Sequence, residues 1–316
     1  MNAMNTFSRQ LFTLCLLIPL ISCAQQQNHS DKQENQQRTF TTQGQRILAI
    51  GDLHGDYEAT QRALILAGAM NTQHQWTGGQ MQLVQVGDQL DRGDGEREIL
   101  DLLDQLAIQA RQAGGKVHVL NGNHEIMNAQ GDLRYVTPKG FDSFGKAQQT
   151  IVNPAIQKLP AFAQARAMAF APGGEYALRL AKRPTVLNLD GNVFVHGGLL
   201  PTHVNYGVER INQTYQDWLS AKIPDLPAML VNEQSPIWTR VYSNPQTPAD
   251  CDALKQTLQK IGGKRMIVGH SVQAHINPDC QEGVWRIDVG MSRAYGGPIE
   301  VLEINGEKVR VLTESK

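Results

Sequence analysis

The chain has 316 residues, and 41% of them are hydrophobic, enough for a full-sized core in one large domain or two smaller ones. Its 29 basic and 30 acidic residues almost cancel. This balance leaves no basic stripe and argues against nucleic acid as a partner, so any phosphate chemistry must come from a local site.

The first 22 residues predict a signal peptide. They carry one charge, Arg9, followed by an apolar run over residues 11–21 that is too short to span a bilayer. The run ends in the letters LISC, which resemble the lipobox of bacterial lipoproteins, with Cys23 as the lipidated residue. An ordinary secretory signal with a chance cysteine is the alternative. In both cases we expect export, and the lipobox implies a periplasmic protein anchored to the outer membrane through its lipid.

Residues 23–45 are mostly polar and predict a flexible tether, because they cannot bury enough surface to fold alone. We expect the folded domain over residues 46–316. Short apolar runs that end in polar residues predict six strands, at 46–50, 81–88, 116–121, 192–196, 264–270 and 285–288.

Helical patterns over residues 57–70 and 99–110 separate the first three predicted strands. This alternation predicts an α/β architecture, in which ligands collect at the carboxyl ends of the strands. Four prolines and an alanine-rich stretch indicate a helical insertion over about 130–185, and the Asn305-Gly306 pair predicts a terminal hairpin. Cys251 and Cys280 could form a disulfide or remain two free thiols.

Five glycine-containing segments each follow a predicted strand. Any one of them is a weak signal, because an Asp-x-His after a strand is more often a turn than a ligand pair. Their combination and order carry the argument: GDLHG at 51–55, GDQLDRG at 87–93, GNHE at 122–125, HGG at 196–198 and GH at 269–270.

These segments hold the donors that phosphate ester hydrolysis requires. A phosphate dianion repels nucleophiles, and two divalent cations about 3.5–4 Å apart neutralise it and activate a water. Such a pair needs a shared carboxylate with imidazole and amide donors. The set contains no thiolate and consists of Asp52, His54, Asp88, Asn123, His196 and His270.

The motifs GDLHG, GDQLDRG and GNHE closely resemble those of the phosphoprotein phosphatase family of metallophosphoesterases. The segment DVGMSRAYGG at 288–297, the insertion and the leader look most like the bacterial Shewanella-like protein phosphatases. The resemblance covers about residues 46–297. It implies a calcineurin-like β-sandwich flanked by helices, with a helical insertion.

The same resemblance assigns roles to the matching positions. Asp52 and His54 would hold the first metal, and Asp88 would bridge to a second one held by Asn123, His196 and His270. Manganese is the expected metal, with iron, zinc and magnesium as alternatives.

His124 would protonate the leaving oxygen, with Asp91 orienting it. Arg92 would clamp the phosphate, and Arg240 is our candidate for a second phosphate-binding arginine. Arg293 and Tyr295 could border the pocket or pack beneath it. Trp238, two residues before Arg240, is a further candidate for the pocket, with packing as the alternative.

We therefore expect a phosphatase that hydrolyses phosphate monoesters by direct attack of a hydroxide bridging the metals. Its substrate would be a phosphorylated protein, with phosphotyrosine at least as suitable as phosphoserine or phosphothreonine, or a small phosphomonoester. The alternatives are a periplasmic nucleotidase or diadenosine tetraphosphatase on the same fold, and a catalytically silent binding lipoprotein.

Overall fold

The computed structural model describes residues 45–145, 154–244 and 247–314. The first of its two five-stranded sheets has the order β10-β9-β1-β2-β3. Strands β1, β2 and β3 are parallel, and the predicted terminal hairpin is confirmed as an antiparallel pair added beside β1. The strands are β1 (Ile47–Ile50), β2 (Gln82–Gln85), β3 (Lys116–Val119), β9 (Glu300–Asn305) and β10 (Lys308–Thr313).

The second sheet has the order β4-β5-β6-β8-β7. Its strands are β4 (Val186–Leu189), β5 (Asn192–Val195), β6 (Arg265–Val268), β7 (Asn277–Asp279) and β8 (Val284–Arg286). All six predicted strands are present, but β4 and β7 were not predicted. The missed signal for β4 was the Asp190-Gly191 turn, with φ of 50° and 85°, which joins it to β5. Strand β7 contains Pro278, which argues against a strand in the interior of a sheet but is tolerated at its edge.

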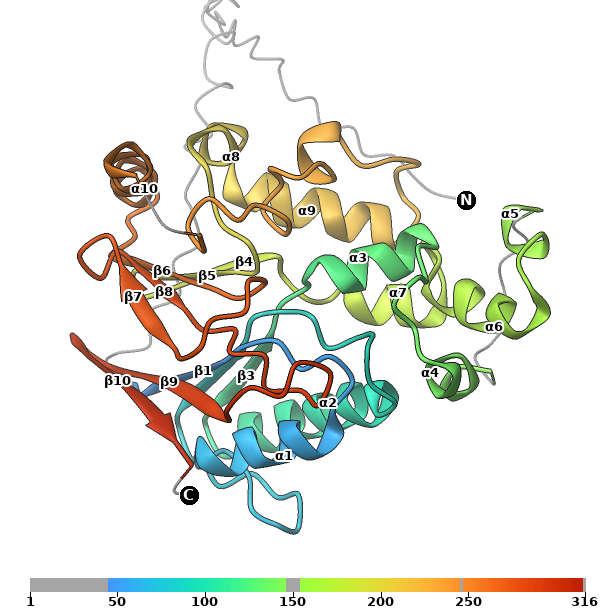
Figure 1. Ribbon diagram of the computed structural model, residues 1–316, viewed down its shortest axis with the longest axis horizontal. Coiled ribbons are helices and arrows are strands. Elements are labelled where there is room, and N and C mark those ends of the chain that lie inside the picture. The colour runs from blue at the N-terminus through green and yellow to red at the C-terminus, as the bar shows by residue number, and fades with distance from the viewer. Residues whose placement is uncertain (1–44, 146–153, 245–246, 315–316) are drawn as a thin grey trace, which may run out of the picture. The chain divides into compact units, whose positions relative to one another are not determined.

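The two sheets face each other and enclose the main core (Figure 1). Side chains along β5 alternate between two cores, since Phe194 points into the sandwich while Val193 and Val195 pack on the outer face of the second sheet. This arrangement confirms the predicted α/β sandwich.

Helices cover both outer faces of the sandwich (Figure 1). The predicted apolar face of α2 is confirmed, with Ile99, Leu102 and Leu106 buried against the first sheet. The helices are α1 (Tyr57–Leu66), α2 (Glu96–Gln112), α3 (Asn123–Gln130), α4 (Pro138–Ser143), α5 (Pro154–Gln157), α6 (Ala161–Phe170), α7 (Glu175–Leu180), α8 (Pro201–Tyr206), α9 (Val208–Leu219) and α10 (Pro248–Lys260), with a 3₁₀ turn at Ala228–Leu230.

The region predicted as a helical insertion contains α4, α5, α6 and α7. Cys251 and Cys280, whose pairing the sequence left open, form a disulfide with their Cα atoms 5.3 Å apart. The predicted signal peptide, Cys23 and nearly all of the tether lie outside the described residues. Within the described part of the chain, no helix is long and apolar enough to cross a membrane.

Candidate metal centre and active site

The six predicted ligands converge at one edge of the sandwich. They follow five strands, β1, β2, β3, β5 and β6, whose carboxyl ends meet there. Each of the six side chains is buried, and the set is Asp52, His54, Asp88, Asn123, His196 and His270.

Asp88 lies at the middle of this group. Its Oδ2 is 3.7 Å from His54 Nε2, and it is 3.2 Å from His196 Nε2. Two clusters of potential metal donors share this one carboxylate, one with His54 and His124 and the other with His196 and His270. A carboxylate between two groups of donors is the geometry that a bridging ligand needs.

Three imidazoles are oriented by backbone carbonyl groups. A carbonyl can only accept a hydrogen bond, so the ring nitrogen beside it carries a proton, and in a neutral imidazole the opposite nitrogen then presents a lone pair to the centre. The pairs are His54 Nδ1 with Leu90 O at 3.2 Å, His196 Nδ1 with Val86 O at 3.0 Å, and His270 Nε2 with Trp238 O at 2.9 Å.

The positions of the ligand lone pairs show whether these residues fit a cation. In the neutral imidazole of His196, the Nε2 lone pair lies 2.9 Å from Asn123 Oδ1 and 3.2 Å from Asp88 Oδ2. Three lone pairs at these separations repel one another unless a positive charge lies among them. A divalent metal held by the two oxygens and the nitrogen satisfies all three atoms at once.

The raised pKa values of three buried acids also indicate a cation site. Burial, together with the charges of Asp288 and Asp88, raises the pKa of Asp52 well above its usual value. Burial is also the main reason that the pKa of Asp288 rises to about 6 and that the pKa of Glu125 is raised. Bound cations would reverse these shifts by stabilising the ionised forms. The site therefore fits two divalent metals held by oxygen and nitrogen donors.

Glu125 organises the loop that carries Asp88, the predicted bridging ligand. Its carboxylate accepts backbone hydrogen bonds from Asp88 at 2.8 Å, Gln89 at 2.9 Å and Gly122 at 2.7 Å. One buried side chain thus ties the GDQLDRG loop to the start of α3, which holds Asn123 in place against Asp88.

The backbone at the site is strained. A left-handed backbone conformation costs energy for any residue other than glycine, and in folded proteins it gathers at functional sites. Close packing adds a second constraint, because a Cβ on Gly122 would lie 2.2 Å from Asp88 Oδ1. The strained site residues, with φ of 45° to 69°, are His54, Asp88, Asp91, Arg92 and His270.

His124 and Asp91 form a buried pair, with Nδ1 and Oδ2 2.6 Å apart. Burial alone lowers the pKa of His124, but the nearby charges of Asp88 and Asp91 outweigh it and raise this pKa overall. The other ring nitrogen, Nε2, faces the centre at 3.8 Å from Asp88 Oδ2. The raised pKa favours the protonated imidazole, which is the form that a general acid requires.

Two tyrosines flank Arg92 at the mouth of the site. The guanidinium lies 4.3 Å from the ring centre of Tyr135 and 5.2 Å from that of Tyr295. Each ring also contacts an imidazole of the centre, Tyr135 that of His124 at 5.2 Å and Tyr295 that of His54 at 5.3 Å. Sequence reasoning named Tyr295 but missed Tyr135, which belongs to no recognised motif and comes near the site only through the fold.

The remaining predicted residues lie on two sides of the centre. Arg240 is exposed, and its Nη1 donates to His270 O at 2.8 Å and to Ser271 Oγ at 2.6 Å. The ring of Trp238 packs edge-on against His270 at 5.6 Å, so this residue contacts a predicted ligand. Arg293 lines a cavity of about 400 Å³ beside His54, and its side chain forms an ion pair with Glu58.

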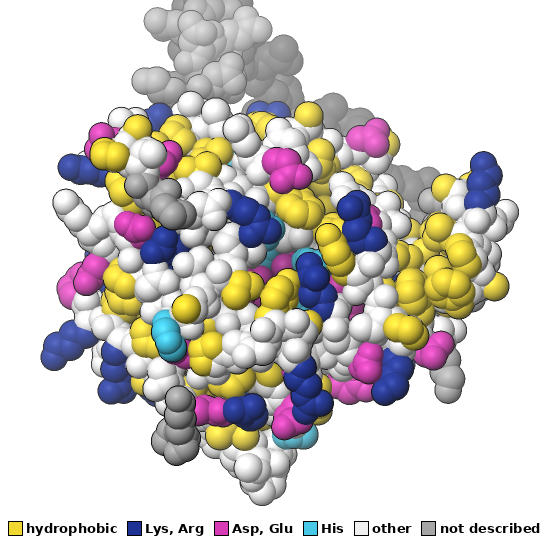
Figure 2. Space-filling view, viewed as in Figure 1, with side chains coloured by type: hydrophobic (Ala, Val, Ile, Leu, Met, Phe, Trp, Pro, Cys, Tyr) yellow, Lys and Arg dark blue, Asp and Glu magenta, His cyan; other side chains and the backbone are white. Residues whose placement is uncertain are grey.

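Figure 2 shows the site from outside. Histidine and acidic side chains lie at the bottom of a hollow near the middle of this face, and Lys and Arg side chains surround it. A phosphate dianion entering the hollow would meet cationic groups at its rim before it reached the buried donors.

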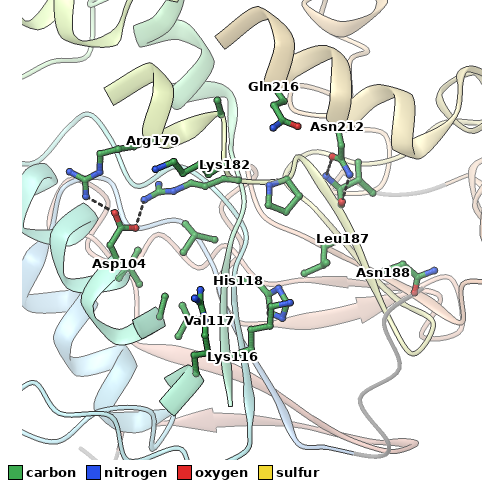
Figure 3. Close-up of a pocket in the computed structure, with 18 of the residues that line it drawn as sticks. Asp104, Lys116, Val117, His118, Arg179, Lys182, Leu187, Asn188, Asn212 and Gln216 are labelled. Carbon is green, nitrogen blue, oxygen red and sulfur yellow. Dashed lines mark hydrogen bonds and ion pairs between the residues drawn. The ribbon is translucent and has the colours of Figure 1, made fainter. Parts of the chain in front are cut away.

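A second hollow of about 610 Å³ lies between the outer edges of β3 and β4 (Figure 3). None of the predicted ligands lines it. Asp104 accepts there from Arg179 at 2.8 Å and from Arg183 at 3.4 Å, and His118 is bonded to Gln82 at 2.8 Å.

Similarities to known proteins identify the family of this chain. Residues 45–274 match the model of the calcineurin-like phosphoesterase family. The chain is 40% identical over 305 residues to Shewanella-like protein phosphatase 2 of Arabidopsis thaliana, covering 86% of this chain and 78% of that one. It is 30% identical to Shewanella-like protein phosphatase 1 of Plasmodium berghei over 86% of this chain and 75% of the other.

A solved structure of a cold-active protein tyrosine phosphatase superposes with a TM-score of 0.72 at 25% identity, covering 86% of this chain and 77% of that one. The predicted fold and phosphatase resemblance are therefore confirmed. The donor set around Asp88 fits the metal chemistry of the same family. The chain belongs to the calcineurin-like phosphoesterases and is a metal-dependent phosphatase.

Proposed function

We propose that this phosphatase acts on phosphorylated proteins and prefers phosphotyrosine, with lower activity toward phosphoserine, phosphothreonine and small phosphomonoesters. The observation that carries the proposal is the pair of rings, Tyr135 and Tyr295, on either side of Arg92. A phenyl phosphate could place its phosphate on the guanidinium and its ring against the tyrosines, whereas serine and threonine esters offer no ring. The name of the superposed tyrosine phosphatase supports the same preference.

Different residues of this chain would carry out different parts of the reaction. Bound divalent metals would supply charge neutralisation and an activated water. Arg92 and Arg240 orient the phosphate from two sides, and the planar guanidinium suits two phosphoryl oxygens. His124 gives a proton to the leaving oxygen, while Asp91 holds the imidazole in its protonated form.

A substrate panel tests the preference. The purified protein is chelated, resupplied with Mn²⁺ and assayed on phosphotyrosine, phosphoserine and phosphothreonine peptides and on diadenosine tetraphosphate. We expect the phosphotyrosine peptide to give the largest kcat/KM. Preference for the dinucleotide would instead favour the nucleotide-hydrolase alternative, and silence toward every substrate would favour the binding lipoprotein.

Variants of the rings make the test specific. Tyr135→Leu and Tyr295→Leu should each reduce kcat/KM for the phosphotyrosine peptide about threefold to tenfold while leaving the phosphoserine peptide nearly unchanged. Tyr206→Leu is the matched control, because Tyr206 also stacks on an arginine, Arg210, at 4.4 Å. Equal losses on both peptides would contradict a role of the rings in choosing the substrate.

Manganese is our proposed metal among those that this donor set accepts. Activity restored to the chelated protein by Mn²⁺, Fe²⁺, Zn²⁺ or Mg²⁺, measured together with bound metal, decides among them. We expect Mn²⁺ to restore the highest turnover at two ions per chain.

We further propose that the chain is exported and carries a lipid on Cys23, which would hold it at the periplasmic side of the outer membrane. The LISC ending supports this proposal, as does the disulfide between Cys251 and Cys280, because such bonds persist in oxidising compartments. Metabolic labelling with an alkyne fatty acid and membrane fractionation test it. Cys23→Ser should remove the label and release the protein from the membrane, whereas labelling that survives this change would contradict the assignment.

A further inference from the structure

Arg166 is a fully buried charge that the mechanism above does not use. It comes from α6, in the region that the sequence indicated as an insertion, and its side chain has no solvent exposure. A buried guanidinium is costly unless every donor is partnered. Its partners therefore show what the residue is built to hold.

The first partner is Glu96 at the start of α2. Arg166 binds both carboxylate oxygens of Glu96, with Nη2 2.8 Å from Oε1, and Nη1 also donates to Gly140 O at 3.0 Å. The rings of Phe144 and Phe170 lie 4.8 Å and 5.1 Å from the guanidinium. This enclosure fixes the orientation of the planar group.

The second set of partners leads to the predicted acid. Arg166 Nε donates to Asn128 Oδ1 at 2.9 Å, and Asn128 Nδ2 donates to Asp91 Oδ1 at 3.1 Å. Arg166 Nη2 also reaches Asp91 Oδ1 directly, at 3.5 Å. One oxygen of Asp91 is thus held by the insertion, which leaves Oδ2 for His124 at 2.6 Å.

Glu96 closes the network from the opposite side, because its Oε1 accepts from the backbone N–H of Asp91 at 2.5 Å. Both the side chain and the backbone of Asp91 therefore depend on the Arg166–Glu96 pair. Removing Arg166 would leave the carboxylates of Asp91 and Glu96 buried together without this cation. The orientation of Asp91, and with it that of His124, would no longer be determined.

We propose that Arg166 is a positioning residue for the general acid: through Asn128 and Asp91 it holds His124 in the orientation that protonates the leaving oxygen. The inference rests on the proposed function of His124. It also gives the helical region a part in catalysis, because α6 supplies the residue that orients Asp91.

The leaving group provides the test. An ester of a good leaving group, such as 2,4-dinitrophenyl phosphate, needs little help from an acid, whereas phenyl phosphate needs it fully. Arg166→Met should lower kcat on phenyl phosphate by about 10- to 100-fold and on dinitrophenyl phosphate by less than about threefold, with KM nearly unchanged. Arg166→Lys, which keeps the charge without the planar fork, should recover part of the loss.

Arg179→Met is the matched control. Arg179 lies in the same region and pairs with Asp104 at 2.8 Å, and no described contact joins it to Asp91. We expect this variant to lower both rates by the same small factor. Asn128→Ala, which interrupts the same path, replaces Arg166→Met if that variant does not fold.

Each outcome decides the question. An equal loss of rate on both esters, or a loss that follows reduced metal content, would overturn the positioning role. His124→Asn is measured in the same series to separate the two proposals. If His124→Asn depends steeply on the leaving group and Arg166→Met does not, only the Arg166 inference fails; if His124→Asn is also insensitive, the acid itself is misassigned and both fail.

Discussion

The metal centre and the hollow of Figure 3 are both lined by charged side chains, but they treat charge in opposite ways. In the hollow, Arg179 and Arg183 both bind Asp104. At the centre, burial and the charges of Asp288 and Asp88 raise the pKa of Asp52. The Nε2 atom of His196 lies 2.9 Å from Asn123 Oδ1 and 3.2 Å from Asp88 Oδ2. In this protein, a cluster of buried acids with raised pKa values, and not the number of charges or the size of the cavity, distinguishes the ligand site.

The largest effect should come from the shared carboxylate. Asp88→Asn removes the charge between the two groups of donors. We expect turnover to fall by a factor on the order of 10³ or more, with loss of bound metal. Substituting residues that only orient metal ligands already costs about 10- to 100-fold in metal affinity. Phosphatase assays and elemental analysis measure both quantities. Full activity with two metals bound would refute a bridging role for Asp88.

The next effect separates chemistry from metal binding. His124→Asn should reduce kcat on phenyl phosphate by about 10² to 10⁴ while metal content stays the same, since His124 is the proposed proton donor and is not among the predicted ligands. Steady-state kinetics and metal analysis on one preparation check this. Unchanged turnover would show that another group protonates the leaving oxygen.

His118, which lines the hollow, should make the stability of the protein depend on pH. Burial, followed by the charge of Lys116, lowers the pKa of His118 to about 3. The unfolded chain takes up this proton near pH 6.5 and the folded protein does not, so His118 reduces the free energy of unfolding as pH falls from about 6.5 to 4. Between about pH 6.5 and pH 4, the free energy of unfolding of His118→Gln should rise by about 2–3 kcal/mol relative to that of the parent. Thermal or urea unfolding at both pH values measures the change, and a constant difference would contradict it.

The smallest effect should come from the paired charge in the hollow. Asp104 is exposed, so Asp104→Asn should lower the free energy of unfolding by no more than about 1 kcal/mol and leave turnover within about twofold of the parent. It makes the same chemical change as Asp88→Asn and is its matched control. A large loss of phosphatase activity would show that the charges of the hollow also affect catalysis at the centre.

The sequence determined the parts of the site that lie within short loops. Asp52 and His54 are two residues apart, and Asp88, Asp91 and Arg92 fall within one loop, so strand ends and motif spacing were enough to predict them. The six predicted strands and the apolar face of α2 followed from local periodicity in the same way. His196 and His270 were assigned through order and resemblance, because each is the single donor in its segment.

The tertiary structure alone decided how these residues are held. Three kinds of contact join segments that lie 32 to 110 residues apart. They are the carbonyl groups that orient the imidazoles, the ring of Tyr135 beside Arg92, and the path from Arg166 to Asp91. The disulfide likewise needed a distance, 5.3 Å between Cα atoms, that two cysteine letters do not contain. Local periodicity and motifs record which donors are available, whereas orientation, burial and charge compensation arise only when distant segments pack together.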